Sequence, residues 1–470
     1  MSDIPNGEEL KEKLFAKKKN GWEKTNPQER ERIFKFAEEY IYFLNHAKTE
    51  REAAKLSKEM LEKNGFQNIE QVESLKEGDK VYYCNRSKTI YAAVIGKEAL
   101  NKGCHIVGAH IDSPRLDLKP NPLYEDNELA LLKTHYYGGI KKYQWTTIPL
   151  SIHGVIVKPD GEKIEVAIGE NEEDPVFTIT DLLPHLAQEQ MEKKLKEGIA
   201  GEDLNILVGS IPFEGTKAPE KVKLNILNIL NKKYGITEVD FMSSELELVP
   251  AFQSKTLGLD RSMVLGYGQD DRVCGFTALR AILNVEKPNK TAICILADKE
   301  EIGSMGNTGM ESQVFDYFIA EILNKKGENK ANALEEVFCH SKMLSADVDA
   351  GLDPTYSHVS EKNNCARLGH GVGLNKYTGA RGKSGASDAN AEYVAEVRNI
   401  FENNDIQYQL SELGKVDVGG GGTIAYILAN KGMDVIDCGI PVLSMHAPSE
   451  VTSKFDIYEA YRAYEAFYKA

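Results

Sequence analysis

The sequence lacks a long hydrophobic run and an excess of positive charge, and each absence excludes a class of protein. No apolar run approaches the roughly 18–20 residues that a membrane-spanning helix needs, and runs such as 292–297 (AICILA) predict buried strands instead. The chain has 57 Lys+Arg against 72 Asp+Glu, which gives a net charge of −15. An acidic protein repels polyanions, so these numbers argue against a general nucleic-acid binder.

Two further absences concern the compartment of the protein. Residues 1–24 have no apolar core behind their charges, so they do not predict a signal peptide. The sequence has no CxxC pair, and its seven cysteines, an odd number, are scattered through apolar segments. We therefore expect buried free thiols in a reducing compartment and place the protein in the cytoplasm.

The length of 470 residues predicts two or three domains, and the texture of the sequence changes twice along the chain. The first 70 residues are typical of helices, with capping boxes at 26–29 (NPQE) and 49–52 (TERE) and a stop at 64–65 (NG). Strands are expected at 89–96 and 104–111.

The middle of the chain predicts an inserted β-rich domain, residues 115–252. Alternating stretches flank the turn at 159–161 (PDG), and one or two helices accompany them. The strands are expected at 147–157, 163–168, 204–212 and 244–252, and the helices at about 180–197 and 219–233.

After residue 260 strands and helices alternate, which predicts an α/β domain with a parallel or mixed sheet and helices on both faces. Joined to the first part of the chain, this gives a discontinuous catalytic domain, residues 1–114 and 253–470. The helices are expected at 272–284, 311–324, 388–403, 419–430 and 455–468, and the strands at 290–297, near 335–346 and at 434–444.

Five polar clusters lie at the ends of apolar runs. They offer nitrogen and oxygen ligands, the set that borderline and hard cations such as Zn²⁺, Mn²⁺ or Co²⁺ take in two-metal sites. The clusters are His110 with Asp112, Asp270 with Asp271, Glu300 with Glu301, Asp347, and His446. Together they predict a two-metal centre.

Each cluster also has an ordinary structural interpretation. His110 could be a core histidine paired with Asp112, and an acidic pair such as 270–271 often caps a helix. Residues 300–301 could form a solvated turn, although their charges and that of Asp298 repel one another and a cation would relieve the repulsion. Asp347 and His446 could each cap a turn.

Three glycine-containing motifs give weaker evidence for a binding site than these five clusters. The GKS string at 382–384 does not make a phosphate loop, because Tyr377 stands where the first Gly is needed. The segment 347–351 (DVDAG) does not make a calcium loop, because its fifth position is Gly and the distal Glu is missing. The Gly run 419–422 before a helix could bind an anion or form a tight turn.

The ordered motifs of the chain resemble the M18 aminopeptidases, the aspartyl aminopeptidase family of dinuclear zinc exopeptidases. The resemblance covers essentially the whole chain. It is carried by GAHIDSPRLDLKP (108–120), GQDDRVCGF (268–276), DKEEIGS (298–304), LSADVDAG (344–351), GGGGTIA (419–425) and VLSMHAPSE (442–450). It implies an α/β phosphorylase/hydrolase-like core with an inserted β-rich dimerisation domain, whose dimers assemble into a tetrahedral dodecamer.

The resemblance also implies roles for single residues. Asp270 would bridge two metal ions, with Glu301 and His446 as the other ligands of one ion and His110 and Asp347 as those of the second. Glu300 would be the general base. Asp112 would orient His110 and raise its basicity. The ions are expected to be zinc, although the N/O set would accept Co²⁺ or Mn²⁺.

Substrate contacts are implied less directly. His185 resembles an insert-domain histidine that reaches the active site of a neighbouring subunit, or it simply begins a helix. Lys376, Arg381 and Lys383 could supply the fixed cation that an acidic substrate side chain needs, or they could solubilise a surface loop. Eukaryotic members carry histidines shortly after the Asp347 position, which this chain lacks, so it resembles a bacterial-type branch.

The sequence therefore predicts a two-metal aminopeptidase that removes an N-terminal residue from peptides, with Asp and Glu as the candidate residues, and that assembles with copies of itself. The metal pair would activate a water and polarise the scissile carbonyl, while Glu300 would take the proton and pass it to the leaving amine. Alternatives are another dimetal amidase, such as a carboxypeptidase or deacylase, and an inert oligomeric shell.

Overall fold

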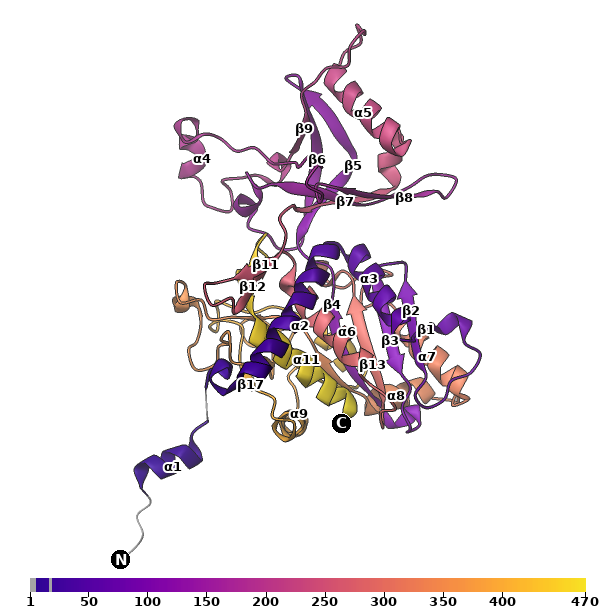
Figure 1. The fold of residues 1–470 in the computed structure, drawn as a ribbon, viewed down its shortest axis with the longest axis vertical. Helices are drawn as coiled ribbons and strands as arrows, with labels where there is room; N and C mark the ends of the chain where they lie inside the picture. Colours follow the sequence, from indigo (N-terminus) through magenta and orange to yellow (C-terminus); the bar gives the residue numbers. More distant parts are fainter. Residues whose placement is uncertain (1–5, 17–18) are drawn as a thin grey trace, which may run out of the picture.

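The computed structural model describes residues 6–16 and 19–470, so residues 1–5 and 17–18 of the predicted catalytic segment 1–114 lie outside the described residues. Figure 1 shows two parts, an α/β part around a large sheet and a smaller part with its own sheet. The smaller part is built from residues between 115 and 250, and the chain before and after it builds the larger part.

The larger part contains a nine-stranded mixed sheet, in agreement with the predicted fold class. Its centre is parallel, because β13, β4, β14 and β18 all run the same way, whereas β3 and β16 pair with this group antiparallel. In spatial order the strands are β1 (Gln67–Asn68), β2 (Lys80–Asn85), β3 (Thr89–Val94), β13 (Thr291–Ala297), β4 (Cys104–His110), β14 (Lys342–Ser345), β18 (Asp434–Gly439), β16 (Val372–Asn375) and β17 (Tyr408–Leu410).

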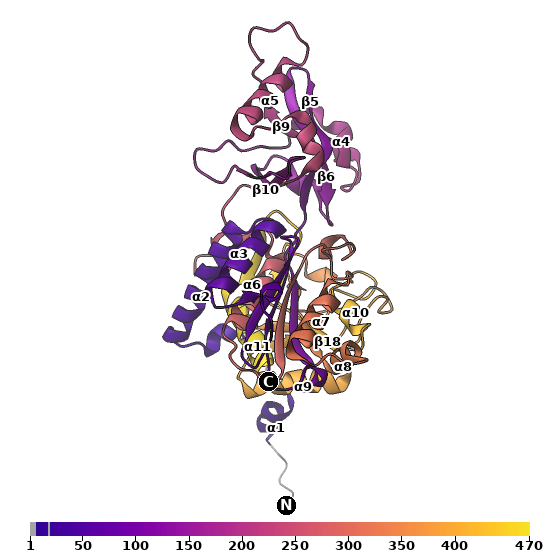
Figure 2. The same ribbon diagram turned by 90° about the vertical axis from the view of Figure 1, so that its right-hand side faces the viewer.

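Helices cover both faces of this sheet (Figure 2) because its central strands are apolar on both sides; every residue of β4 and β13 is buried. One hydrophobic core lies under α2 (Pro27–His46), α3 (Glu50–Lys63), α6 (Gln269–Leu283), α9 (Ala391–Asn403) and α11 (Lys454–Lys469). The other lies under α7 (Val314–Lys326), α8 (Ala333–His340) and α10 (Ala425–Ala429).

The predicted capping boxes are confirmed at the starts of α2 and α3, where Asn26 pairs with Glu29 and Thr49 with Glu52. The helix α1 (Gly7–Leu14) precedes them and buries none of its residues. No helix in the described part of the chain is long and apolar enough to cross a membrane. All seven cysteines are free, but Cys84 is only half-buried and Cys339 is exposed, so the expectation of burial holds for five.

The smaller part is a six-stranded antiparallel sheet with α5 (Lys221–Tyr234) packed against it. In spatial order its strands are β8 (Lys163–Ile168), β7 (Leu150–Val157), β10 (Ser244–Pro250), β5 (Arg115–Asp126), β6 (Leu129–Tyr137) and β9 (Ile206–Gly209). A third sheet of short strands joins β11 (Lys255–Leu257), β12 (Met263–Gly266), β20 (Glu450–Ser453), β19 (Pro441–Leu443) and β15 (Asp349–Ala350).

Several predicted elements are wrong in part. The helix expected at 419–430 is only α10, and the strand expected at 434–444 is divided into β18 and β19, which belong to different sheets. The helix expected at about 180–197 is reduced to a 3-10 turn (Pro184–Leu186) and the short α4 (Gln188–Glu192), because this segment buries almost none of its apolar side chains. The strand expected near 335–346 is confirmed only as β14, since α8 occupies 333–340 and buries Ala333 and Val337, one turn apart, on one face.

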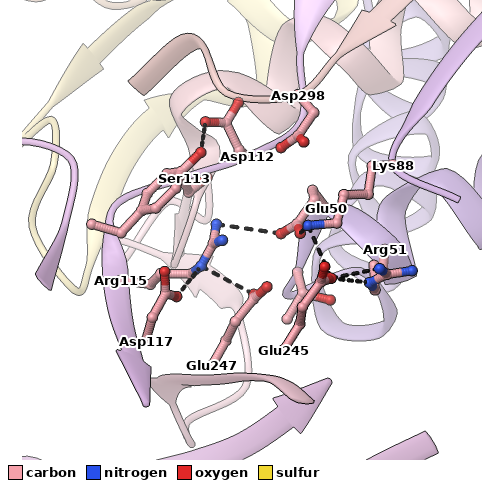
Figure 3. A network of polar contacts seen from close by, with 12 residues as sticks. Glu50, Arg51, Lys88, Asp112, Ser113, Arg115, Asp117, Glu245, Glu247 and Asp298 are labelled. Atoms are coloured by element: carbon pink, nitrogen blue, oxygen red, sulfur yellow. Dashed lines mark hydrogen bonds and ion pairs between the residues drawn. The ribbon is translucent and has the colours of Figure 1, made fainter. Parts of the chain in front are cut away.

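A charge network that is buried at Glu50, Arg115 and Glu247 and exposed at Glu245 ties the smaller part to α3 (Figure 3). Arg115 at the start of β5 pairs with Glu50 of α3 (Nη1 to Oε2, 3.3 Å) and with Glu247 of β10 (Nε to Oε2, 3.2 Å). Lys88 pairs with Glu50 at 3.1 Å and with Glu245 at 3.0 Å. Separating the members of a buried pair would leave an uncompensated charge, which is costly. The network therefore holds the start of β5 against α3.

Candidate metal centre

Three of the predicted clusters meet because their strands are neighbours in the parallel centre of the sheet. The order β13, β4, β14 brings the carboxyl ends of all three strands to one edge. His110 is the last residue of β4, Glu300 and Glu301 form a 3-10 turn shortly after β13, and Asp347 follows β14 by two residues.

The other two clusters come from different elements. Asp270 lies at the start of α6, where the Asp270–Asp271 peptide bond is cis and the backbone is not yet helical. His446 lies between β19 and β20 of the third sheet. Both side chains reach the edge where β13, β4 and β14 end, so all five predicted ligand residues come together.

Asp270 stands between the two histidines. Its Oδ1 lies 3.2 Å from His110 Nε2, and its Oδ2 lies 3.1 Å from His446 Nε2. Asp270 consequently belongs to two groups of potential ligand atoms, each with all atoms within 4.8 Å of one another. One group is His110, Asp270 and Asp347, and the other is Asp270, Glu301 and His446.

Asp112 links His110 to the turn that carries Glu300. Its Oδ1 lies 3.3 Å from His110 Nδ1 and accepts a hydrogen bond from the backbone N–H of Glu300 at 3.2 Å. Its Oδ2 accepts from the N–H of Glu301 at 3.2 Å and from the hydroxyl of Tyr137 at 2.9 Å. With Nδ1 facing Asp112, the Nε2 atom of His110 points into the centre.

Glu300 borders the centre: its Oε2 lies 3.8 Å from His110 Nε2, and the side chain keeps 17 % of its surface exposed. Burial is the main cause that raises the pKa of Glu300 to about 7, and the carboxylates of Asp270 and Asp112 add to the rise. A carboxyl that titrates near neutral pH can both accept and return a proton there.

The charges of the centre fit a cation. Burial raises the pKa of both Glu301 and Asp347 above the ordinary range, and a neighbouring carboxylate adds to each rise, Asp270 for Glu301 and Asp271 for Asp347. Glu301 Oε1 is buried and finds no hydrogen-bond partner within the described chain. An imidazole and two carboxylates in each group form the N/O set that zinc and its neighbours bind.

Other residues, which no motif in the sequence indicated, hold the ligands in place. Glu450, buried in β20, accepts hydrogen bonds from the backbone N–H groups of Gln269 (2.6 Å), Asp270 (3.2 Å) and His446 (2.9 Å). The carbonyl of Gly139 lies 2.8 Å from His446 Nδ1, which leaves Nε2 facing Asp270. Glu450 closes the quoted motif 442–450, but nothing in its spacing indicated backbone contacts.

The predicted substrate residues lie outside the two ligand groups. Asp388 pairs with Lys376 at 3.9 Å and with Lys383 at 2.9 Å, and Lys383 also lies over the ring of Tyr377. Lys376, Lys383 and Arg381 are all exposed. His185 is exposed in the 3-10 turn before α4, in the smaller part of the molecule.

Comparison with known proteins gives consistent similarities. The family profile described as aminopeptidase I zinc metalloprotease (M18) matches residues 43–468. A probable M18 family aminopeptidase 1 of Clostridium acetobutylicum is 54% identical over 97% of this chain and 98% of its own. The crystal structure of an M18 family aminopeptidase from Thermotoga maritima is 48% identical, with a TM-score of 0.93, and covers 97% of this chain and 100% of its own.

A more distant solved structure shares the fold. The mApe1 dodecamer of S. cerevisiae is 23% identical, with a TM-score of 0.74 over 92% of this chain and 96% of that one. The named relatives are aminopeptidases, so these similarities do not favour the carboxypeptidase, deacylase or inert-shell hypotheses.

Proposed function

Because this chain belongs to the M18 family of zinc metalloproteases and is an aminopeptidase, we propose that it holds two divalent metal ions at the Asp270 centre and removes N-terminal residues from peptides with their help. The observation that carries the proposal is the position of Asp270, whose two carboxylate oxygens face His110 and His446. A bridging carboxylate is what a two-metal site requires.

Each ion has its own set of side chains in this proposal. His110 and Asp347 complete one set around Asp270, and Glu301 and His446 complete the other. We expect zinc as the metal, with Co²⁺ or Mn²⁺ as substitutes that the same donors accept. When bound, such ions lower the pKa of a water and polarise the scissile carbonyl.

Glu300 is the proposed general base. Its position beside His110 and its pKa of about 7 support a carboxylate that takes the proton of the attacking water and then delivers it to the leaving amine. Asp112 positions both His110 and Glu300 for this step, because it contacts His110 Nδ1 and accepts a hydrogen bond from the backbone N–H of Glu300. It is a positioning residue, because it belongs to neither ligand group and acts through His110 and the backbone of Glu300 and Glu301.

The substitution Glu300→Gln tests this assignment, because it removes the base and keeps the shape of the side chain. We expect kcat to fall by about 10²–10⁴-fold, the usual contribution of general acid–base catalysis. Metal content, measured by mass spectrometry, should be unchanged. The matched control is Glu311→Gln, because Glu311 is an exposed glutamate that accepts a hydrogen bond from the Tyr426 hydroxyl. Near-full turnover of the Glu300 variant with both metals bound would remove Glu300 from the mechanism.

An acidic N-terminal residue is the proposed preferred substrate. Lys376, Arg381 and Lys383 concentrate three cations in one exposed loop, and Asp388 pairs with two of them. Arg381, the third, is therefore the stronger candidate for binding a substrate carboxylate, because a guanidinium can hold it through two hydrogen bonds. The rate ratio between Asp and Leu N-terminal amides, in wild type and in Arg381→Glu, measures this preference.

The protein is proposed to form a homo-oligomer in the cytoplasm, with dimers assembling into a dodecamer. The smaller part exposes many large apolar side chains, including Val176, Leu182, Leu183, Leu186, Met191, Leu195 and Ile211. Such exposure is typical of an interaction surface. His185 lies among these leucines, which supports a position from which it reaches the centre of a neighbouring copy. Light scattering that gives the mass of one chain would contradict the oligomer.

A further inference from the structure

A second group of polar side chains is enclosed in the α/β part, apart from the metal centre. All but Thr423 are at most 6% exposed, and Thr423 is half-buried. We call this group the Asp349–Asp437 cluster, which consists of Ser345, Asp349, Asn375, Ser411, Thr423 and Asp437. None of these residues belongs to either group of potential ligands at Asp270.

Strand register places the core of this cluster on one face of the nine-stranded sheet. Asp437 of β18 is paired with Ser345 of β14 on one side and with Asn375 of β16 on the other. Residues paired across neighbouring strands present their side chains to the same face. Ser411 follows β17, and its Oγ lies 2.7 Å from Asn375 Oδ1, so the polar row continues from β14 through β18 and β16 to the end of β17.

Thr423 and Asp349, which lie outside the nine-stranded sheet, form hydrogen bonds to members of this row. Thr423, which follows the glycine run, donates its hydroxyl to Asp437 Oδ1 at 2.7 Å. Asp349 of β15 accepts a hydrogen bond from Ser411 through Oδ2. Gly373 leaves room for this carboxylate, because a Cβ atom there would lie only 2.5 Å from Asp349 Oδ2.

The cluster holds two carboxylates and no counter-charge. None of the ion pairs among residues 6–16 and 19–470 involves Asp349 or Asp437. Asp349 Oδ1, Asp437 Oδ2 and Ser345 Oγ are buried, and none of them makes a hydrogen bond of good geometry in the described chain. The side chains of Asn375 and Ser345 still favour the charged forms of Asp349 and Asp437. Two buried carboxylates, each with one poorly satisfied oxygen, favour a cation between them.

We propose that the Asp349–Asp437 cluster binds a hard divalent cation, of the Ca²⁺ or Mg²⁺ class, through oxygen atoms alone. Two carboxylates supply the charge, and hydroxyl and amide oxygens supply the remaining ligands that such cations take. The absence of imidazole and thiolate from these six residues separates this site from the zinc-type donors at Asp270. The site is not the calcium loop rejected from the sequence, since only Asp349 comes from 347–351.

The bound ion would act as a structural link. It would join the edge strands β16 and β17 to β14, and it would join the turn before α10 to β18 through Thr423. Asp349 follows Asp347 by two residues, so the same ion would also hold the segment that carries a proposed ligand of the catalytic centre. The proposal does not depend on peptide hydrolysis and can be tested without it.

The experiment uses protein already saturated with Zn²⁺ and freed of excess metal. Ca²⁺, Mg²⁺ or K⁺ is added separately, and bound ions per chain are counted by equilibrium dialysis with mass spectrometry while Tm is followed. We expect Ca²⁺ or Mg²⁺ to add one ion per chain and to raise Tm by about 2–3 °C at a hundredfold excess over Kd.

Variants assign the ion to the cluster. Asp437→Asn should abolish both the additional ion and the rise in Tm, whereas Asp434→Asn, at the other end of β18, should respond like the wild type. If Asp437→Asn does not fold, Ser345→Ala keeps both carboxylates and should weaken binding. The proposal is overturned if neither divalent cation adds an ion, if only K⁺ binds, or if the ion persists unchanged in these variants.

Discussion

Glu450 holds the backbone of two proposed metal ligands, Asp270 and His446, and belongs to neither ligand group itself. Its two oxygens accept backbone N–H groups on either side of the centre, those of Gln269 and Asp270 from α6 and that of His446 from the third sheet. A carboxylate with three N–H donors is preorganised in a way that an amide cannot reproduce.

Replacing this carboxylate should therefore weaken metal binding. In Glu450→Gln the amide NH₂ group must face a backbone N–H, which displaces Asp270 or His446. We expect the affinity for zinc to fall by about 10–100-fold, as is usual when a group that orients a ligand is lost. Competition with a chelating dye measures this affinity, with Glu392→Gln on the exposed side of α9 as the control. Unchanged affinity would show that Glu450 does not position the ligands.

At the residue scale, the sequence could predict which residues meet but not how they are supported. His110, Asp347 and the 300–301 pair stand at the ends of apolar runs, and neighbouring parallel strands must end at one edge. Glu450, Tyr137 and Gly139 carry no such signal. Their contacts depend on where other elements lie, and two of the three act on or through the backbone.

The contact between α3 and β7 depends on a charged histidine. His153 of β7 lies 2.7 Å from Glu52 of α3 through Nδ1 and 3.0 Å from Glu170 through Nε2. Burial by itself lowers the pKa of His153, but the hydrogen bonds to Glu170 and Glu52 outweigh it and raise the pKa to about 9. With a carboxylate at each nitrogen, the imidazolium joins the smaller part to the larger one.

This pair of contacts predicts a loss of stability at alkaline pH. The folded pKa of His153 lies above the unfolded value, so its contribution is fully present below about pH 6.5 and is lost as the pH rises through about 9. Tm should fall more between pH 7 and 10 in the wild type than in His153→Gln. The control variant is His135→Gln, because His135 is exposed. Equal falls in the wild type and in His153→Gln would rule out this contribution.

The type of a helix or strand was predictable where the hydrophobic periodicity and the capping or turn residues indicated the same element. The starts of α2 and α3 follow from their capping boxes, and β8 matches the predicted 163–168. The sequence of α8 (ALEEVFCH) fits both a strand and a helix, and only its packing against the core decides. The long β5–β6 pair was missed, since its strands alternate poorly and contain a register shift between Leu118 and Leu123.

On the scale of the whole molecule, the two parts build one centre. The chain leaves the larger part after β4, forms the six-stranded sheet, and returns before β12 (Figure 1). The segment that ends β6 brings the Tyr137 hydroxyl to Asp112 and the Gly139 carbonyl to His446. The smaller part thus contributes directly to the geometry of the proposed metal centre, in addition to its proposed role in assembly.

The most direct measurement is hydrolysis of matched Asp, Glu, Leu and Lys N-terminal chromogenic amides by chelator-stripped protein, before and after Zn²⁺, Co²⁺ or Mn²⁺ is returned. We expect no activity without metal, recovery on metal addition, loss of activity when the substrate amine is acetylated, and fastest cleavage of the acidic amides. Full activity in the stripped protein, or equal cleavage of acetylated substrates, would contradict a two-metal aminopeptidase centred on Asp270.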